Sequence, residues 1–343
     1  MACHVELLLG EPLIMKLRLQ HFAQSVFIAI LSFSFYGCDK GDGHITLKLA
    51  HSLDTGHSVH KSMIFMNERL KDLSNGTMDI EIYPNGQLGS ERDSMELLQI
   101  GSIAITKVST SPMEGFVPKM KIFSIPYVFR DEDHLWRVLN GKIGQDLLIE
   151  GEAVKLRGLA YYDAGSRSFY TRDKPIRTPK DLEGLKIRVQ KSQTSVRMVE
   201  ALGGSATPIS FGELYTALQQ GVVDGAENNP PSFYLSKHYD VARYYTQDMH
   251  TSVPDILLMS GPIWNNLTTK QQTWVQEAAR LSVPYQRKLW KTSSDAALKA
   301  VEEAGVKIIQ PDKAAFKEAV KGMHDSYKGS PVHELMQQIA DIK

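Results

Sequence analysis

The sequence predicts an α/β protein that is long enough for two domains. Residues 45–51 and 78–83 alternate apolar and polar side chains, as half-buried strands do, and residues 103–108 form a third, mostly apolar strand. Segments with helical spacing, residues 58–73 and 90–100, separate these strands. This β-α-β-α-β order indicates a layered domain whose strands are mostly parallel. The full 343 residues exceed what one ordinary core needs.

The rest of the chain continues the alternation of helices and strands, and it contains one unusually long helix. Helices are expected at 131–140, 143–150, 192–202, 211–220 and 268–304, and strands at 156–164, 186–189 and 255–260. Thr268 and Gln271 have the spacing of a capping box, as do Ser210 and Glu213.

The composition is that of a soluble globular protein and excludes several classes of function. The chain is 42% hydrophobic and 23% charged, and its 39 basic residues balance its 39 acidic ones. A zero net charge without a basic stretch predicts no nucleic-acid partner. We find no nucleophile with a base beside it and no glycine-rich phosphate loop, so the sequence predicts neither an enzyme nor a cofactor.

The first 37 residues are expected to be a signal segment. Lys16 and Arg18 precede an apolar stretch at 26–36 that is too short to span a membrane. Met15 is an alternative start to Met1, because the residues before Met15 contain acidic side chains that fit a signal peptide poorly.

The end of this segment, Gly37-Cys38, is similar to a bacterial lipoprotein cleavage site. Cys38 is then the lipidated first residue, residues 38–44 are a linker, and Asp39 is similar to an inner-membrane retention signal. The alternative is an ordinary signal peptide with an incidental cysteine. Only one other cysteine exists, Cys3 at the same end, so the mature domain is expected to have no disulfide.

Arg188 is the first candidate binding residue. It lies in a predicted strand, residues 184–189, whose other face is apolar, so the register gives Arg188 a defined direction. A guanidinium group is suited to two-point recognition of a carboxylate. The alternative is a surface arginine that pairs with Asp181 or Glu183.

Two further polar residues lie on similar small-residue scaffolds. Arg167 follows the predicted strand 156–164, and Asn228 lies in the segment 221–230, where its amide can add a neutral donor. Asn229 is adjacent to Asn228, and spacing alone does not choose between them.

Several motifs resemble those of one family. In the family's order they are YPNGQLG at 83–89, FSIPY at 123–127, DLEGLKIRV at 181–189, ELYTALQ at 213–219 and VDGAEN at 223–228. From about residue 45 to its end, the chain resembles the extracytoplasmic solute-binding subunits of tripartite ATP-independent periplasmic (TRAP) transporters.

The resemblance implies a two-domain periplasmic solute-binding fold with a hinge cleft, and a long C-terminal helix that spans both domains. Domain I is expected to comprise residues 45–164 and 254–293, and domain II residues 165–253 and 294–343. The chain is expected to cross the hinge near Ala164, Val253 and Ser293.

The resemblance also assigns roles in the second domain and at the end of one strand. Arg188 is expected to bind the ligand's carboxylate, with Arg167 as a second arginine and Asn228 as the amide donor. Phe211 is expected to pack on the ligand's carbon skeleton, its alternative being a core aromatic. Ser109 occupies a ligand-facing position at which some family members carry a carboxylate.

Three more residues of the first domain are candidates. His51 ends the first strand and would face the cleft, where open α/β sheets place their ligands. Lys107 shares a strand face with Ser109, its alternative being an edge or snorkelling lysine. Arg92 is expected either to reach the cleft or to bind only Glu91.

His51 lies in a loose group with His57 and His60. A metal site is an alternative for these imidazoles, but their spacing is no recognised ligand set, so we expect no metal. His57 is expected to contact the ligand or simply to begin the helix, and His60 to lie on the helix face.

The expected function is capture of an organic acid in the periplasm by a monomer, which closes and is presented to the membrane permease subunits. A hexuronate, galacturonate or glucuronate, is preferred, because its hydroxyl groups would use His51, Lys107, Ser109 and Arg92. Residues 160–170 and 227–231 also resemble the uronate-binding branch. The alternative ligand is a C4-dicarboxylate. The alternative functions are ligand sensing beside a membrane receptor and catalysis as a periplasmic enzyme.

Overall fold

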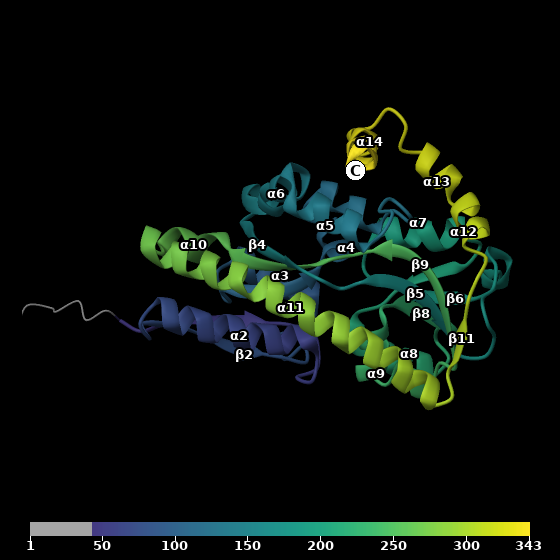
Figure 1. Ribbon diagram of the computed structural model, residues 1–343, viewed down its shortest axis with the longest axis horizontal. Helices are drawn as coiled ribbons and strands as arrows, with labels where there is room; N and C mark the ends of the chain where they lie inside the picture. The colour runs from purple at the N-terminus through teal and green to yellow at the C-terminus, as the bar shows by residue number, and fades with distance from the viewer. Residues whose placement is uncertain (1–42) are drawn as a thin grey trace, which may run out of the picture. The chain divides into compact units, whose positions relative to one another are not determined.

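The computed structural model describes residues 43–343. The expected signal segment, Cys38 and most of the linker lie outside these residues. Within them, no helix combines the length and the apolar character needed to cross a membrane. Residues 45–343 form one compact unit that contains two β-sheets (Figure 1).

The first sheet has the strand order β2-β1-β3-β10-β4. Its strands are β1 (Ile45–Ala50), β2 (Met78–Tyr83), β3 (Ile105–Ser109), β4 (Leu156–Tyr162) and β10 (Asp255–Ser260). β1 pairs in parallel with β2 and β3, and α2 (Ser58–Leu73) and α3 (Glu91–Gln99) connect them, which confirms the predicted β-α-β-α-β order. β10 lies antiparallel between β3 and β4.

The second sheet has the order β11-β9-β5-β8-β6-β7 and mixes parallel with antiparallel pairs. Its strands are β5 (Ser166–Thr171), β6 (Lys186–Val189), β7 (Ser205–Pro208), β8 (Gly225–Asn228), β9 (Tyr244–Ser252) and β11 (Lys307–Ile309). Of these six strands, β6 was predicted from the sequence. The predicted face of β6 is correct in that Ile187 and Val189 are fully buried.

The other helices surround these sheets (Figure 1). The α-helices are α4 (Thr110–Met113), α5 (Glu132–Asn140), α6 (Lys142–Ile149), α7 (Gln193–Ala201), α8 (Leu214–Gln219), α9 (Pro230–Leu235), α10 (Gly261–Asn266), α12 (Lys313–Ala319), α13 (Lys321–Asp325) and α14 (Pro331–Asp341). The 3-10 helices are η1 (Pro118–Ser124), η2 (Glu150–Val154), η3 (Pro179–Leu182), η4 (Phe211–Glu213) and η5 (His238–Asp240).

The long helix α11 (Thr269–Glu303) packs on both parts of the unit. It contacts α2 and β4 beside the first sheet and α9 beside the second, as Figure 1 shows. Its N-terminus carries the predicted capping box, because Thr268 Oγ1 accepts from the Gln271 amide and the Gln271 side chain accepts from the Thr268 amide. A long C-terminal helix that spans both sheets is therefore confirmed.

The chain crosses between the sheets three times. Two crossings are adjacent connections, from β4 to β5 and from β9 to β10, and the third follows α11 from β10 to β11. At the first, Asp163 exchanges two backbone hydrogen bonds of 2.8 Å with the side chain of Gln286 on α11. Gly165 follows at φ +58°, and a β-carbon there would lie 3.2 Å from Trp290 Nε1, so this tight turn requires glycine. These crossings lie near the expected hinge positions, but the exact domain boundaries stay a prediction.

Candidate functional site

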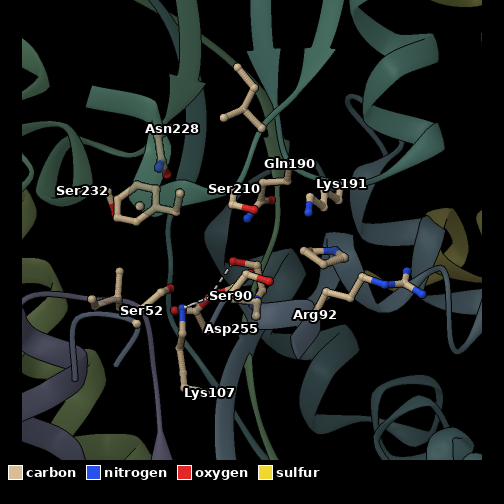
Figure 2. Close-up of a pocket in the computed structure, with 18 of the residues that line it drawn as sticks. Ser52, Ser90, Arg92, Lys107, Gln190, Lys191, Ser210, Asn228, Ser232 and Asp255 are labelled. Atoms are coloured by element: carbon tan, nitrogen blue, oxygen red, sulfur yellow. Dashed lines mark hydrogen bonds and ion pairs between the residues drawn. The ribbon is translucent and has the colours of Figure 1, made fainter. Parts of the chain in front are cut away.

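A cavity of about 390 Å³ lies where strands of both sheets end. The first sheet contributes the segments after β1 and β2, the start of α3, and facing residues at the ends of β3 and β10. The second contributes the segments after β6, β7 and β8. Ligands of open α/β sheets bind at the carboxyl ends of strands, so this is where the topology predicts a binding site. Figure 2 shows Lys107 and Asp255 on one side of the cavity and Asn228 across from them.

Arg188 is a buried cation on the wall of this cavity. Its side chain leaves β6 on the face opposite to the apolar core, and only 2% of the residue is exposed. Nε donates to the Ile209 carbonyl at 2.8 Å, while Nη1 has no hydrogen-bond partner among residues 43–343. Burial lowers the pKa of Arg188 from its ordinary value, although a guanidinium stays charged under any native condition.

The described residues also give Arg188 no ion pair, so the predicted alternative, a surface pair with Asp181 or Glu183, is not formed. Asp181 instead caps the turn at Thr178. A buried cation without a contacting counter-ion is costly, because one hydrogen bond to the Ile209 carbonyl and the more distant charges of Glu227 and Glu91 do not replace its hydration. Arg188 therefore lacks a contacting anion, which a ligand in the cavity would supply.

Arg167 differs from Arg188 because its charge is already compensated. Its Nε and Nη2 donate to the carboxylate of Glu227, the second at 2.9 Å, and Nη1 donates to Asn228 Oδ1 at 2.9 Å. The pairing orients the guanidinium rigidly at the cavity wall. Glu227 and Asn228 use four of the five N–H groups of Arg167. One N–H of Nη1 and a positive field remain for a ligand, but no unpaired charge.

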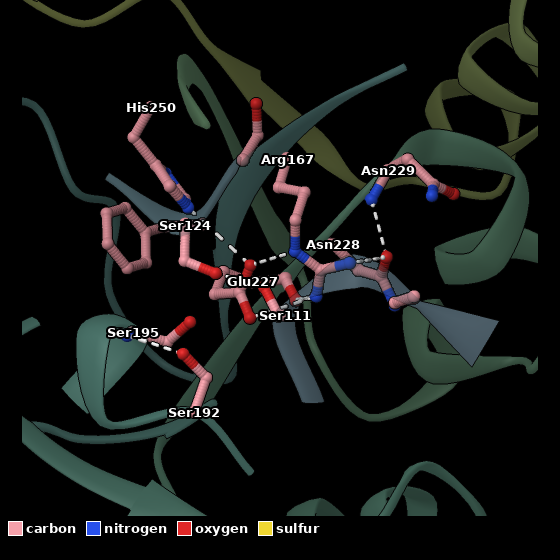
Figure 3. A network of polar contacts seen from close by, with 12 residues as sticks. Ser111, Ser124, Arg167, Ser192, Ser195, Glu227, Asn228, Asn229 and His250 are labelled. Atoms are coloured by element: carbon pink, nitrogen blue, oxygen red, sulfur yellow. Dashed lines mark hydrogen bonds and ion pairs between the residues drawn. The ribbon is translucent and has the colours of Figure 1, made fainter. Parts of the chain in front are cut away.

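Behind Arg167 the ion pair extends into a buried row of alternating charges (Figure 3). His250 Nε2 lies 3.5 Å from Glu227 Oε2, and His250 Nδ1 lies 2.6 Å from Asp248 Oδ2. Burial alone would lower the pKa of His250, but Asp248 and Glu227 outweigh it and raise the pKa to about 9. Burial likewise would raise the pKa of Glu227, but Arg167 and His250 hold it at about 2. Two cations and two anions therefore cancel within the protein.

Asn228 is oriented by this same network. Its Oδ1 accepts hydrogen bonds from Arg167 Nη1 and from the Asn229 amide, both at 2.9 Å. The amide nitrogen Nδ2 is therefore the donor that remains for the cavity. Asn229 also lines the cavity, but its Oδ1 caps α9 by accepting from the Ser232 amide at 2.9 Å.

The opposite wall carries Lys107 between two carboxylates. Its Nζ lies 3.1 Å from Asp255 Oδ1 and 3.2 Å from Glu91 Oε1. Ser109 joins them, since Oγ donates to Asp255 Oδ1 at 3.0 Å and its amide donates to Glu91 Oε1 at 3.1 Å. Burial would lower the pKa of Lys107, but the two acids outweigh it and raise the pKa above its ordinary value. Burial, with the nearby Glu91, raises the pKa of Asp255 above its ordinary value, although Lys107 and Ser109 oppose the shift. With both acids ionised, the group of Lys107, Glu91 and Asp255 has a net charge of −1.

His51, His57 and His60 form a buried group near this wall, and only His57 lines the cavity. His51 Nδ1 accepts from the Leu53 amide, which places the ring proton on Nε2, and Nε2 donates to His60 Nδ1 at 2.9 Å. These two bonds hold His51 behind the lining. His57 does begin α2, because its Nδ1 accepts from the Val59 amide at 3.2 Å. That bond places the ring proton on Nε2, which has no partner among the described residues.

Phe211 closes the cavity between the two sheets. It is partly buried, packs against the core of the first sheet although it follows β7 of the second, and contacts the His238 ring edge-on at 5.7 Å. The expected capping box of Ser210 and Glu213 is not formed, because Ser210 makes no side-chain cap bond. The predicted helix begins with one 3-10 turn, η4, and continues as α8. Ser210 and Glu213 line the cavity instead.

Arg92 lies at the cavity rim rather than in its interior. Its Nε donates to Glu96 Oε1 at 3.1 Å, one helical turn away, and half of its side chain is exposed. The expected pairing with Glu91 is wrong, because Glu91 turns toward Lys107. Arg92 still lines the cavity and stays a candidate for ligand contact.

The structure thus brings Arg188, Arg167, Asn228, Phe211, Lys107, Ser109 and Arg92 to one cavity and leaves His51 behind its lining. It also adds Glu91 and Asp255, which were not selected from the sequence, and His57, for which ligand contact and the start of the helix were both left open. Asp255 is the first residue of β10 and is paired directly with Ser109, the position singled out at the end of β3. That cross-strand neighbour was the signal that could have found it. Within residues 43–343 no group of histidine, cysteine and acidic side chains is arranged to hold a metal ion.

Known proteins with this fold bind organic acids. The structure of a TRAP periplasmic solute-binding protein from Bradyrhizobium sp. BTAi1 with galacturonate is 40% identical, covers 86% of this chain and 99% of that one, and has a TM-score of 0.84. A Pseudomonas putida F1 counterpart with bound D-glucuronate is 37% identical, with 87% and 97% covered and a TM-score of 0.84. The C4-dicarboxylate-binding periplasmic protein DctP of Rhodobacter capsulatus is 30% identical, with 82% and 86% covered.

The family similarity extends over both walls of the cavity. Residues 49–330 match the family described as bacterial extracellular solute-binding protein, family 7. The resemblance expected from the sequence motifs is therefore confirmed. The chain belongs to the bacterial extracellular solute-binding protein family 7 and is a solute-binding protein of the TRAP type.

Proposed function

We propose that this protein captures a hexuronate, galacturonate or glucuronate, and delivers it to the membrane permease subunits of a TRAP transporter. The observation that carries the proposal is Arg188, a cation that is 98% buried at the cavity wall without a counter-ion among the described residues. The carboxylate of the sugar acid supplies the negative charge that Arg188 lacks. Asn228 Nδ2 and the remaining N–H of Arg167 Nη1 donate hydrogen bonds beside it.

The opposite wall favours a ligand with hydroxyl groups. Ser90, Ser109 and the carboxylates of Glu91 and Asp255 present hydroxyl and carboxylate oxygens to the cavity. A sugar acid can donate its hydroxyl protons to these oxygens, and Phe211 covers the apolar face of its ring. Similar proteins solved with galacturonate and with glucuronate support this choice.

The proposed role is binding without catalysis. Ligand contacts from both sheets make the closed form more stable than the open form, so that binding shifts the equilibrium toward closure. The protein acts as a monomer in the periplasm and needs no cofactor.

A thermal denaturation series tests the ligand. Galacturonate or glucuronate at a hundred times its dissociation constant contributes about 2.7 kcal/mol to stability, so the denaturation temperature should rise by several degrees. Succinate and malate should raise it much less at the same concentration. A large shift with succinate and none with either uronate would contradict the hexuronate and favour a C4-dicarboxylate, the ligand class of the R. capsulatus relative.

We further propose that residues 1–37 are removed and that Cys38 is lipidated and holds the protein at the inner membrane. The support is Gly37-Cys38 after an apolar stretch, with no cysteine after Cys38. Labelled palmitate should enter the wild-type protein and not Cys38→Ser. Equal labelling of both, or wild-type protein recovered free in the periplasm, would exclude the anchor and leave the signal segment in place.

A further inference from the structure

The wall of the cavity opposite Arg188 carries a charge that bears on ligand choice. Lys107 neutralises only one of the two carboxylates it touches, Asp255 at 3.1 Å and Glu91 at 3.2 Å. The side chains of Glu91 and Asp255 are 13% and 6% exposed, and both residues line the cavity, so bulk water screens this charge weakly.

Each acid also has an oxygen that the protein does not use. The hydrogen bonds from Lys107 and Ser109 reach Oε1 of Glu91 and Oδ1 of Asp255. Within residues 43–343 no group donates a hydrogen bond to Oε2 of Glu91 or to Oδ2 of Asp255. Both atoms keep some solvent-accessible surface, since neither is among the fully buried atoms without a partner. Two carboxylate oxygens are therefore held in place and free to accept hydrogen bonds.

The geometry points to Glu91 and Asp255 as the residues that set ligand specificity. They accept hydrogen bonds from the hydroxyl groups of the bound acid and repel a second carboxylate. This inference rests on the proposed sugar-acid ligand. Glu91 and Asp255 are the two groups that would distinguish a sugar acid from a dicarboxylate of similar length.

Arg188 fixes a carboxylate at one end of the ligand. It lies on β6, which pairs with the strand of Asn228, and Figure 2 shows Asn228 across the cavity from Lys107 and Asp255. The other end of the ligand therefore faces the pair of acids. A hydroxyl group there donates to Oε2 or Oδ2, whereas a carboxylate has no proton to donate and meets like charge. Lys107 does not reverse this, because it is shared between both acids and the sum stays negative.

The test is titration calorimetry of wild type, Glu91→Gln and Asp255→Asn with galacturonate, glucuronate and succinate at neutral pH. Each variant keeps the shape of the side chain and removes one negative charge. The amide that replaces the acid has a single oxygen, which stays with Lys107, and its NH2 group cannot accept from the ligand's hydroxyl group. Uronate affinity should therefore fall about ten- to hundredfold. Succinate affinity should stay level or rise, so that the uronate-to-succinate preference falls by at least the same factor.

Glu68→Gln is the matched control. Glu68 carries the same charge and is exposed on α2, but it does not line the cavity and does not touch Lys107. This control should leave the uronate-to-succinate preference within about threefold of wild type. A larger change would mean that loss of any negative charge alters the preference. Denaturation temperatures of all variants are measured alongside. Glu91→Gln is the less disturbing substitution for the fold, because Glu91 is the more exposed of the two acids.

The outcomes separate this inference from the proposed function. If wild type binds a uronate and neither variant changes the preference, Glu91 and Asp255 are not specificity residues and the proposed ligand stands. If wild type binds succinate and no uronate, the proposed ligand and this inference both fall.

Discussion

Replacing Arg188 with methionine should reduce uronate affinity by a hundredfold or more. The carboxylate of the ligand would still be buried in the cavity but would lose the cation that compensates its charge. Leaving one partner of a buried ion pair alone costs roughly 3–5 kcal/mol, and each 1.4 kcal/mol is about a factor of ten. Calorimetry with galacturonate measures the change, and an affinity within threefold of wild type would remove Arg188 from the site.

The same substitution should make the ligand-free protein more stable. Arg188 is a buried charge without a counter-ion among the described residues, and methionine fills a similar volume without that electrostatic penalty. Weak binding together with a raised denaturation temperature would show that the loss is not a folding defect. Arg92→Met is the matched control, because Arg92 also lines the cavity but is half exposed and already paired with Glu96. Its effect on affinity should be under tenfold.

The contrast between Arg188 and Arg167 shows what sequence could and could not predict. The short strand with one apolar face predicted the direction of Arg188, and the structure confirms it as β6 with that side chain at the cavity. Arg167 was selected as a similar residue. Its charge is cancelled by Glu227, sixty residues away in sequence, on a strand that the periodicity did not predict. Which arginine lacks a counter-ion depends on strand pairing, and no local pattern contains that information.

The first sheet was easier to predict than the second for a physical reason. β1 and β2 have one solvated face and alternate in polarity, whereas β9 buries polar residues on its own strand, such as Thr246, Asp248 and His250. Those side chains form hydrogen bonds with one another or with the backbone, so they can be buried although they are polar. The residues of β9 therefore read as a polar segment in the sequence.

The misplacement of His51 has a similar cause. Its position at the end of β1 was predicted correctly, but its ring turns to His60 and to the Leu53 amide. His57, six residues further, reaches the lining because the segment after β1 curves before α2 begins. The end of a strand predicts the neighbourhood of a site, and the connection that follows decides which side chain enters it.

Stability of the ligand-free protein should be greatest near pH 6.5 and should fall steeply in acid. Burial, with nearby cations, lowers the pKa of His51, His57 and His238 to about 3 in the folded protein. The cations are Lys107 beside His51 and His57, and Arg188 beside His238. Below pH 6.5 the three histidines bind protons in the unfolded chain but stay neutral in the folded protein. The free energy of unfolding therefore decreases as the pH falls toward 3.

Each of these three histidines should lower the free energy of unfolding by up to about 2 kcal/mol between pH 6.5 and pH 5. Glu227 deepens the loss in stronger acid, since its contribution is present above its unfolded pKa of 4.5 and disappears toward pH 2. His250 has the opposite sign. Its folded pKa of about 9 exceeds the unfolded value, so its contribution is complete below pH 6.5 and is lost as the pH rises through 9.

Urea unfolding at pH 5, 6.5 and 9 measures both sides of this maximum, and two variants separate them. His57→Asn keeps an oxygen that can accept from the Val59 amide at the start of α2, but it does not titrate, so it should remove about a third of the acid loss. His250→Gln should destabilise the protein at pH 6.5 and flatten the loss toward pH 9, because no proton remains to be released between Asp248 and Glu227. An acid slope unchanged in His57→Asn, or an alkaline slope unchanged in His250→Gln, would mean that the ring binds the same number of protons in the folded protein as in the unfolded chain. The charge assignment derived from burial and ion pairing at that histidine would then be wrong.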